Sequence, residues 1–273
     1  MAGIVLIRGG GDLASGVALR LHHTGLQVVM TELPQPLVVR RLAAFAEAIS
    51  QGQTSVEGVV GRRAISLQDA SLILAKREIP VLVDPDARVC RDLRPSVMVD
   101  GRMTKRPPDV GIDAAPLVIG LGPGFVAGEN CHAVIETQRG HTMGRVLWQG
   151  SAQPDTGVPE NLGGSLTYGL PERILRAPAD GNLQAYASIG DHLDPGQVVA
   201  EVSGQPVLAP LRGVLRGLLQ PGFAVWRGLK IGDVDPRDDP SYCTLVSDKS
   251  LAVAGGVLEA ILAQPGIRQL LWG

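Results

Sequence analysis

The stretch that most limits the possible folds is GIVLIRGGGDLASG, residues 3 to 16. An apolar run of strand length stops at three glycines and passes into a segment where Leu13, Val17 and Leu21 recur at helical spacing. Gly25 then supplies a C-terminal stop for that helix. A buried strand that turns through glycine into a helix predicts an α/β protein.

The same alternation continues along the first half of the chain. The expected elements are a strand at 26–32, a helix from Pro36 to Gly52, a strand at 56–60, a helix from Ser66 and a strand at 80–84. Further short apolar runs predict more strands up to residue 150. Strands that alternate with helices are typical of a parallel sheet. We therefore expect a Rossmann-like, mostly parallel sheet over residues 1–150.

The second half contains an internal repeat. The segment that begins at Ala177 aligns without gaps with the segment that begins at Ala209, and Ala-Pro, several glycines and a leucine coincide. Two copies of a short strand-and-turn unit can pack as a pseudo-twofold pair. This resembles the barrel-sandwich fold of biotinyl and lipoyl carrier domains. The joint between the copies, residues 202 to 208, has no lysine, so we expect neither biotin nor lipoate.

After the repeat, Ser247 is a candidate N-cap for a last amphipathic helix. The predicted fold is thus an α/β domain at 1–150, followed at 151–273 by a barrel-sandwich β module with a C-terminal helix.

The glycine-rich turn is also the first candidate binding site. The sequence GGGDLA, residues 9 to 14, fits the dinucleotide fingerprint G-x-G-x-x-A, in which glycines let the backbone approach a pyrophosphate. Glu32 ends the next expected strand, where an acid holds a ribose hydroxyl. Asp12 could instead cap the helix, and its charge would repel a phosphate. The turn is therefore a site for a dinucleotide such as NAD, a capped structural corner, or a site for another anionic ligand. Its residues are Gly9, Gly10, Gly11, Asp12 and Glu32.

A second candidate site lies between the two halves. Gly122 and Gly124 form another glycine-rich turn after an apolar run, at the edge where parallel sheets bind ligands. Beyond it, Arg139 and Arg145 could grip a small anionic ligand, and His141 could act as an acid or base near neutral pH. The alternative for this segment is a solvated hairpin turn.

Cys131 and His132 lie just before these arginines. Neighbouring residues in a strand point to opposite faces, which suits one metal site poorly, and we predict no metal. Cys131 is either a small buried residue or a reactive thiol. If the site is catalytic, Cys131 and His141 are its candidate residues.

Composition narrows the class of protein. The chain has 273 residues and a formal net charge of −2, which gives no electrostatic argument for nucleic acid or an anionic membrane. No apolar run approaches the ~18 residues of a membrane span. The three cysteines are far apart and suit a reducing cytosol better than a disulfide scaffold. We expect a cytoplasmic protein that binds neither nucleic acid nor membrane.

Six separated blocks resemble one family across nearly the whole chain. They are IRGGGDLASGVA, TELPQPLVVRR, ETQRGHTMGR, APLRGVLRGLL, KIGDVDPR and SDKSLAVAGGVLEA. The family is the YqeB-type accessory protein of the selenium-dependent molybdenum hydroxylase system. The resemblance implies a maturation factor whose partner is a molybdenum hydroxylase and which handles the molybdenum cofactor or its sulfur or selenium ligand.

Two other functions stay open at this point. One is a nicotinamide-dependent oxidoreductase that uses Gly9, Gly11 and Glu32. The other is a non-catalytic module that docks a partner enzyme. The resemblance carries no settled reaction, so it leaves open whether the protein is an enzyme.

Overall fold

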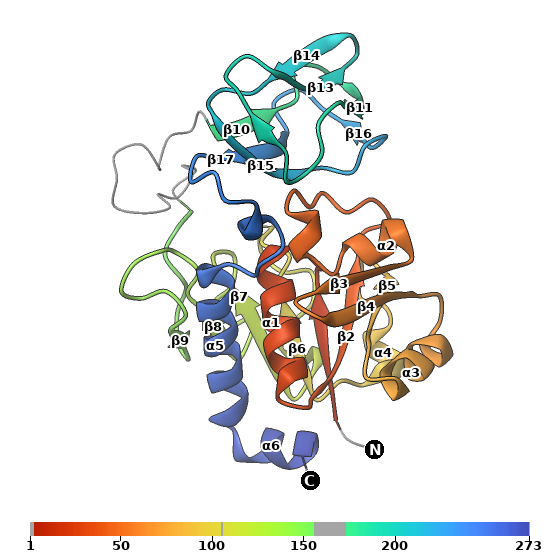
Figure 1. The fold of residues 1–273 in the computed structure, drawn as a ribbon. Helices are drawn as coiled ribbons and strands as arrows, with labels where there is room; N and C mark the ends of the chain where they lie inside the picture. The colour runs from red at the N-terminus through yellow and green to blue at the C-terminus, as the bar shows by residue number, and fades with distance from the viewer. Residues whose placement is uncertain (1–2, 105, 156–172, 273) are drawn as a thin grey trace. The chain divides into compact units, whose positions relative to one another are not determined.

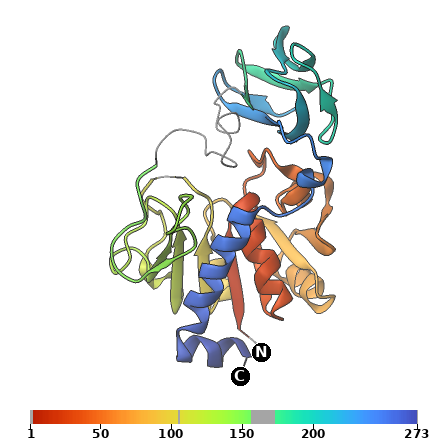
Figure 2. The same ribbon diagram turned by 60° about the vertical axis from the view of Figure 1, so that its left-hand side comes forward.

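The computed structural model describes residues 3–104, 106–155 and 173–272, drawn in Figures 1 and 2. The chain forms two units. One contains Met1–Pro36, Ala44–Asp155 and Val246–Gly273, and the other contains Leu37–Ala43 and Thr156–Leu245. The C-terminal helix therefore belongs to the first unit, not to the second as the boundary at residue 150 predicted. The reason is that its apolar face packs on the first helix of the chain.

The first unit is built on a nine-stranded mixed sheet with the order β3-β4-β5-β2-β1-β6-β7-β8-β9. The strands are β1 (Ile4–Arg8), β2 (Gln27–Glu32), β3 (Gln53–Val56), β4 (Val59–Ala64), β5 (Ile79–Val83), β6 (Val97–Asp100), β7 (Leu117–Leu121), β8 (Ala133–Ile135) and β9 (Val146–Leu147). The inner neighbours pair in parallel, whereas β3 with β4 and β8 with β9 pair antiparallel.

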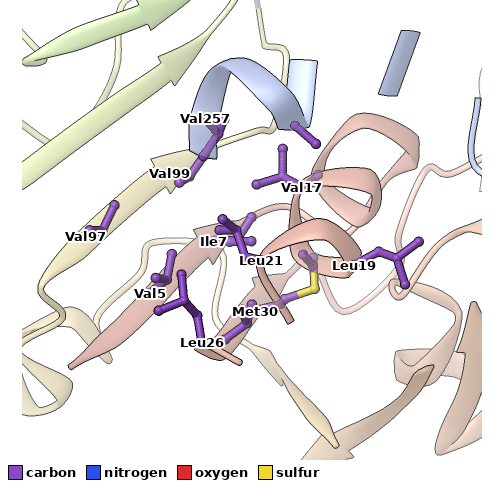
Figure 3. Packing of buried hydrophobic residues seen from close by; sticks show 14 of the residues in the cluster. Val5, Ile7, Val17, Leu19, Leu21, Leu26, Met30, Val97, Val99 and Val257 are labelled. Atoms are coloured by element: carbon purple, nitrogen blue, oxygen red, sulfur yellow. The ribbon is translucent and has the colours of Figure 1, made fainter. Parts of the chain in front are cut away.

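Both faces of this sheet are buried. Successive residues of each strand point to opposite sides, and the residues on each side belong to a core cluster. Val5 and Ile7 of β1 join the larger core cluster, whereas Leu6 joins a separate cluster on the other face. Figure 3 shows the larger cluster, in which Val17 of α1 (Asp12–His23) and Val257 of α5 (Asp248–Leu262) accompany the strand residues. The helices α1 and α5 lie side by side on this face (Figures 1 and 2).

Four shorter helices complete the first unit. They are α2 (Glu47–Gln51), α3 (Leu67–Ala75), α4 (Cys90–Leu93) and α6 (Pro265–Trp272). Helix α3 starts as predicted, with the Ser66 side chain accepting a hydrogen bond from the Asp69 N–H. Among the described residues no single helix is long and apolar enough to cross a membrane. Helices α5 and α6 meet that criterion together, but they are bent by 98° at their junction.

The predicted Rossmann-like sheet is wrong in its strands and connections. The expected lone strand at 56–60 is the turn of an antiparallel hairpin, since Glu57 and Gly58 both have positive φ and reverse the chain between β3 and β4. The expected helix at 36–52 is interrupted and leaves only the short 3-10 helix Arg41–Ala43 and α2. The described residues between β6 and β7 hold only a 3-10 turn, Ile112–Ala114. Helix α5, from the other end of the chain, covers one face instead.

The second unit consists of two antiparallel four-stranded sheets, with the orders β10-β17-β15-β12 and β14-β13-β11-β16. Their strands are β10 (Ile174–Arg176), β11 (Gly181–Ala185), β12 (His192–Leu193), β13 (Val198–Val202), β14 (Gln205–Leu208), β15 (Gly213–Leu218), β16 (Ala224–Val225) and β17 (Lys230–Asp235). The first repeat copy supplies β11 to β13 and the second supplies β15 to β17. The copies interlock, because β12 pairs with β15 and β16 pairs with β11.

The predicted biotinyl- or lipoyl-like barrel-sandwich module is wrong as well. Each antiparallel sheet takes one strand, β10 or β14, from outside the repeat, so the repeat alone does not make up the unit. The turn between β13 and β14 is formed by Ser203 and Gly204, which both have positive φ.

Candidate functional site

The glycine-rich turn joins the carboxyl end of β1 to the start of α1, and Glu32 lies against it. The Glu32 carboxylate accepts hydrogen bonds from the Gly10 N–H at 2.6 Å and from the Leu33 N–H at 2.7 Å. Burial raises the pKa of Glu32, and these two N–H groups and the charge of Arg102 offset the rise only in part. The structure thus places Glu32 and Gly10 together, with the acid holding the turn.

Asp12 is the first residue of α1 and not its N-cap. The N-cap is Gly11, which has no side chain to cap the helix. The Asp12 carboxylate instead accepts a hydrogen bond at 3.0 Å from the hydroxyl of Ser250, which is buried in the first turn of α5. The N-cap residue of α1 therefore supplies no side-chain acceptor to the opening N–H groups of the helix. Such groups, with the helix dipole behind them, favour an anion.

Gly10 has a structural reason to be glycine that involves no ligand. A Cβ at this position would lie 2.8 Å from the backbone nitrogen of Ala46. The Gly10 carbonyl accepts hydrogen bonds from the Ala46 N–H and from the Ser15 hydroxyl, both at 2.9 Å. The space beside Gly10 is thus filled by the chain itself, and only the far side of the turn is available to a ligand.

The second glycine-rich turn is packed in the same way. Gly122 and Gly124 have φ of +71° and +106°, conformations that side chains rarely adopt. A Cβ at Gly122 would lie 2.5 Å from the Thr137 hydroxyl, and one at Gly124 would lie 2.6 Å from the Arg106 carbonyl oxygen. The chain fills the spaces that a ligand would need at these two glycines, so packing accounts for this turn.

The segment with Arg139, His141 and Arg145 forms a turn that belongs to the first unit. Arg139 is engaged with Asp248, the first residue of α5, through two hydrogen bonds of 2.7 Å. The Arg145 side chain donates to the His141 carbonyl oxygen at 3.2 Å, and both residues are exposed. His141 and Arg145 are thus neighbours on an open surface, as in the solvated-turn interpretation.

Cys131 is fully buried, and burial raises the pKa of its thiol to about 11. A cysteine acts as a nucleophile only as the thiolate. The structure therefore favours the interpretation of Cys131 as a small core residue. His132 lies half-buried, and its Nδ1 accepts a hydrogen bond from the Val118 N–H at 3.0 Å.

The first turn of α5 connects the two groups of predicted site residues. Ser250 holds Asp12 of the glycine-rich turn, and Asp248 holds Arg139. Sequence reasoning missed this role because it assigned the C-terminal helix to the other domain. The hydroxyl and carboxylate at the start of α5, in SDKS, were the available signal.

A second feature missed from the sequence is a network of two arginines and two aspartates at the carboxyl ends of β1 and β6. Arg8, which has no exposed surface, contacts Asp100 at 3.3 Å and Asp109 at 2.6 Å. Arg102 contacts Asp100 at 2.6 Å and Asp109 at 2.7 Å. The signal was present, since Arg8 and Asp100 end neighbouring parallel strands, whose carboxyl ends meet at one edge.

The chain was compared with known proteins. It is 47% identical over 259 residues to the uncharacterized protein YqeB of Escherichia coli K12, and the match covers 95% of this chain and 47% of YqeB. This chain is a homologue of YqeB. It spans about half the length of that relative, whose name assigns no activity. No family model matches the chain.

Solved structures give only remote similarity. The ectoine utilization protein EutE (DoeB) of Ruegeria pomeroyi is 11% identical, covers 86% of each chain and has a TM-score of 0.24. A succinylglutamate desuccinylase/aspartoacylase of Rhodobacter sphaeroides is 14% identical over 85% of each chain, with a TM-score of 0.25. An aspartoacylase family protein of Mesorhizobium loti is 10% identical over 86% of this chain and 85% of that chain, with a TM-score of 0.27. Scores this low carry nothing over to this chain.

Proposed function

We propose that this protein is an accessory factor that binds a phosphate-bearing cofactor, the molybdenum cofactor, on behalf of a selenium-dependent molybdenum hydroxylase. The observation that carries the binding role is the start of α1. Its opening N–H groups follow a glycine-rich turn whose N-cap residue, Gly11, has no side chain, while the Asp12 carboxylate bonds to Ser250. A helix N-terminus that follows a glycine-rich turn is suited to a phosphate. The hydroxylase as partner rests on the six sequence blocks described above.

The geometry favours handling of the cofactor over transfer of its sulfur or selenium ligand. Transfer through this chain would need a reactive thiol, and Cys131 is buried with a raised pKa. The phosphate end of a cofactor needs only N–H donors and positive charge. The start of α1 supplies backbone N–H groups and the positive end of the helix dipole.

A nicotinamide-dependent oxidoreductase is the second candidate. One observation favours it, namely that Glu32 ends β2, where the dinucleotide pattern places the acid that holds a ribose hydroxyl. Both carboxylate oxygens of Glu32 already accept backbone N–H groups, however, and Ala46 covers one side of Gly10. A ribose would have to share Glu32 with two existing hydrogen bonds.

The test is the metal content of the hydroxylase purified from a strain that lacks this protein. We expect the hydroxylase polypeptide to remain abundant while its molybdenum content and activity fall. If transfer of the selenium ligand is not part of the role, the fall in selenium follows the loss of molybdenum and does not exceed it. Full occupancy of both elements with normal activity would reject the maturation role and leave the nicotinamide enzyme as the better account.

A further inference from the structure

The Asp109 carboxylate is held by two guanidinium groups at once. Arg8 donates to it through Nη1 at 2.6 Å and Nη2 at 3.3 Å, and Arg102 donates through Nη2 at 2.7 Å and Nη1 at 3.2 Å. Each arginine thus makes a two-point contact with a single carboxylate. Arginine recognises carboxylate and phosphate groups in proteins with this paired geometry.

Other groups of the protein also hold the two arginines in place, independently of Asp109. Asp100, whose side chain is 3% exposed, accepts from Arg8 Nη1 at 3.3 Å and from Arg102 Nε and Nη2 at 2.9 and 2.6 Å. The Pro85 carbonyl oxygen accepts from Arg8 Nη2 at 3.0 Å. Departure of Asp109 would therefore leave an oriented pair of guanidinium groups with one buried counter-charge.

Asp109 itself is the exposed member of the network. Its side chain is 54% exposed, against 1% for Arg8. It also lines a pocket of about 1180 Å³, together with Arg91, Arg94 and His132. Solvent and solutes can therefore reach the carboxylate from the pocket, whereas Arg8 and Arg102 contact the carboxylate and are not among the described residues that line the pocket. Two arginines around one carboxylate have the geometry of an anion-binding site. Here the anion is the side chain of Asp109, which belongs to the protein itself.

We propose that Arg8 and Arg102 form a binding site for the phosphate or carboxylate group of a ligand in this pocket, and that the Asp109 carboxylate occupies the site until such a group displaces it. A phosphate offers more oxygen acceptors than a carboxylate to the same N–H donors, which favours the exchange. The pocket is large enough for a ligand that carries such a group on a larger body. This site uses side chains of β1 and of the segment after β6, not the amides of α1, so it stands apart from the proposed function.

Asp109→Asn tests the proposal, because it removes the competing charge and keeps the size of the side chain. Calorimetric titration with inorganic phosphate at low ionic strength should show at least tenfold tighter binding to this variant than to the wild-type protein. Asp113→Asn is the matched control, since Asp113 is exposed and lines the same pocket; it should bind phosphate as the wild type does. Acetate in place of phosphate shows whether a carboxylate suffices.

The double variant Asp109→Asn, Arg102→Gln should lose this gain in phosphate affinity, because one of the two guanidinium groups is absent. Equal phosphate affinity in the wild type, Asp109→Asn and Asp113→Asn would overturn the proposal, as would a gain that survives in the double variant.

A second measurement needs no variant. Phosphate, compared with chloride at equal ionic strength, should speed amide hydrogen exchange at residues 106–111 of the wild-type protein as Asp109 is displaced, and unchanged exchange would also overturn it. Neither measurement involves the hydroxylase, so a failure here leaves the maturation role untouched.

Discussion

Ser250 donates a hydrogen bond to Asp12 at 3.0 Å, although the two residues are 238 positions apart in the chain. The contact joins the first turn of α5 to the first turn of α1 at the edge of the sheet where the glycine-rich turn lies. It fixes one oxygen of the Asp12 carboxylate on α5, beside the turn whose N-cap is Gly11. The C-terminal helix thus helps to position the residue that follows the glycine-rich turn.

The first prediction concerns this contact. Ser250→Ala should lower the free energy of unfolding by about 1–2 kcal/mol, because a buried hydroxyl that donates to a carboxylate is lost. Ser71→Ala is the control, since Ser71 is exposed in α3 and bonds only within its own helix; its effect should stay within about 0.5 kcal/mol. Urea denaturation of both variants gives the comparison. Equal effects would mean that the Ser250–Asp12 contact contributes nothing to stability.

The second prediction concerns Glu32. Glu32→Ala removes the acceptor for the Gly10 and Leu33 N–H groups and should cost roughly 1–3 kcal/mol of stability. Denaturation measures that cost. Calorimetry with NAD, NADP, ATP and CTP then separates the two functional candidates. A nucleotide that binds the wild type and loses roughly 1–3 kcal/mol of binding energy in the variant would support the nicotinamide enzyme.

The third prediction is a pH dependence. Burial raises the pKa of Cys131 to about 11, above its ordinary value of 9.0. Between about pH 9 and pH 11 the unfolded chain loses the Cys131 proton while the folded chain keeps it. The free energy of unfolding therefore falls as the pH rises through this range. Each pKa unit corresponds to about 1.4 kcal/mol, so wild type should lose about 2–3 kcal/mol relative to Cys131→Ala across that range.

The other two cysteines are present in both of these proteins, so their contributions cancel in the comparison. Parallel stability curves for wild type and Cys131→Ala would show that Cys131 titrates normally. That result would reopen a role for its thiolate.

The fourth prediction concerns the core of the second unit. Leu218 is 1% exposed, so Leu218→Ala should cost about 2–5 kcal/mol. Trp226 lies in the same repeat copy but is 52% exposed, and Trp226→Ala should cost less than about 1 kcal/mol. Thermal or chemical denaturation compares them. A reversed order would mean that Trp226 is the buried residue.

Local patterns in the sequence predicted several elements correctly. The apolar period located β1, α1, β2 and the buried faces of α1, and Ser66 and Ser247 marked the starts of α3 and α5. The strands of the repeat recur in both copies. These features depend on residues close together in the chain, where spacing and capping determine the outcome.

Long-range packing was not predictable from the same patterns. Nothing local indicates that α5 returns to pack on α1, or that Ala46 covers one side of Gly10. The run at 36–52 has helical composition, yet part of it belongs to the second unit and only its end forms α2. Glu57-Gly58 signalled a hairpin turn, but the apolar residues around it suggested a single strand.

The proposed function requires that the amides at the start of α1 bind an anionic cofactor. Gly11 has extended backbone torsions suited to an N-cap, so Gly11→Asp should place a negative charge on those amides without breaking the helix. Gly11→Asn adds the same cap without the charge. The difference between the two variants isolates electrostatic repulsion from the effect of a cap.

The most direct measurement is mass spectrometry of the small molecules released from the wild-type protein and both variants, each purified from a strain that makes the hydroxylase. We predict a phosphate-bearing pterin from the wild type, less from Gly11→Asn and none from Gly11→Asp. A nicotinamide dinucleotide in its place, or the same yield from all three proteins, would contradict the account.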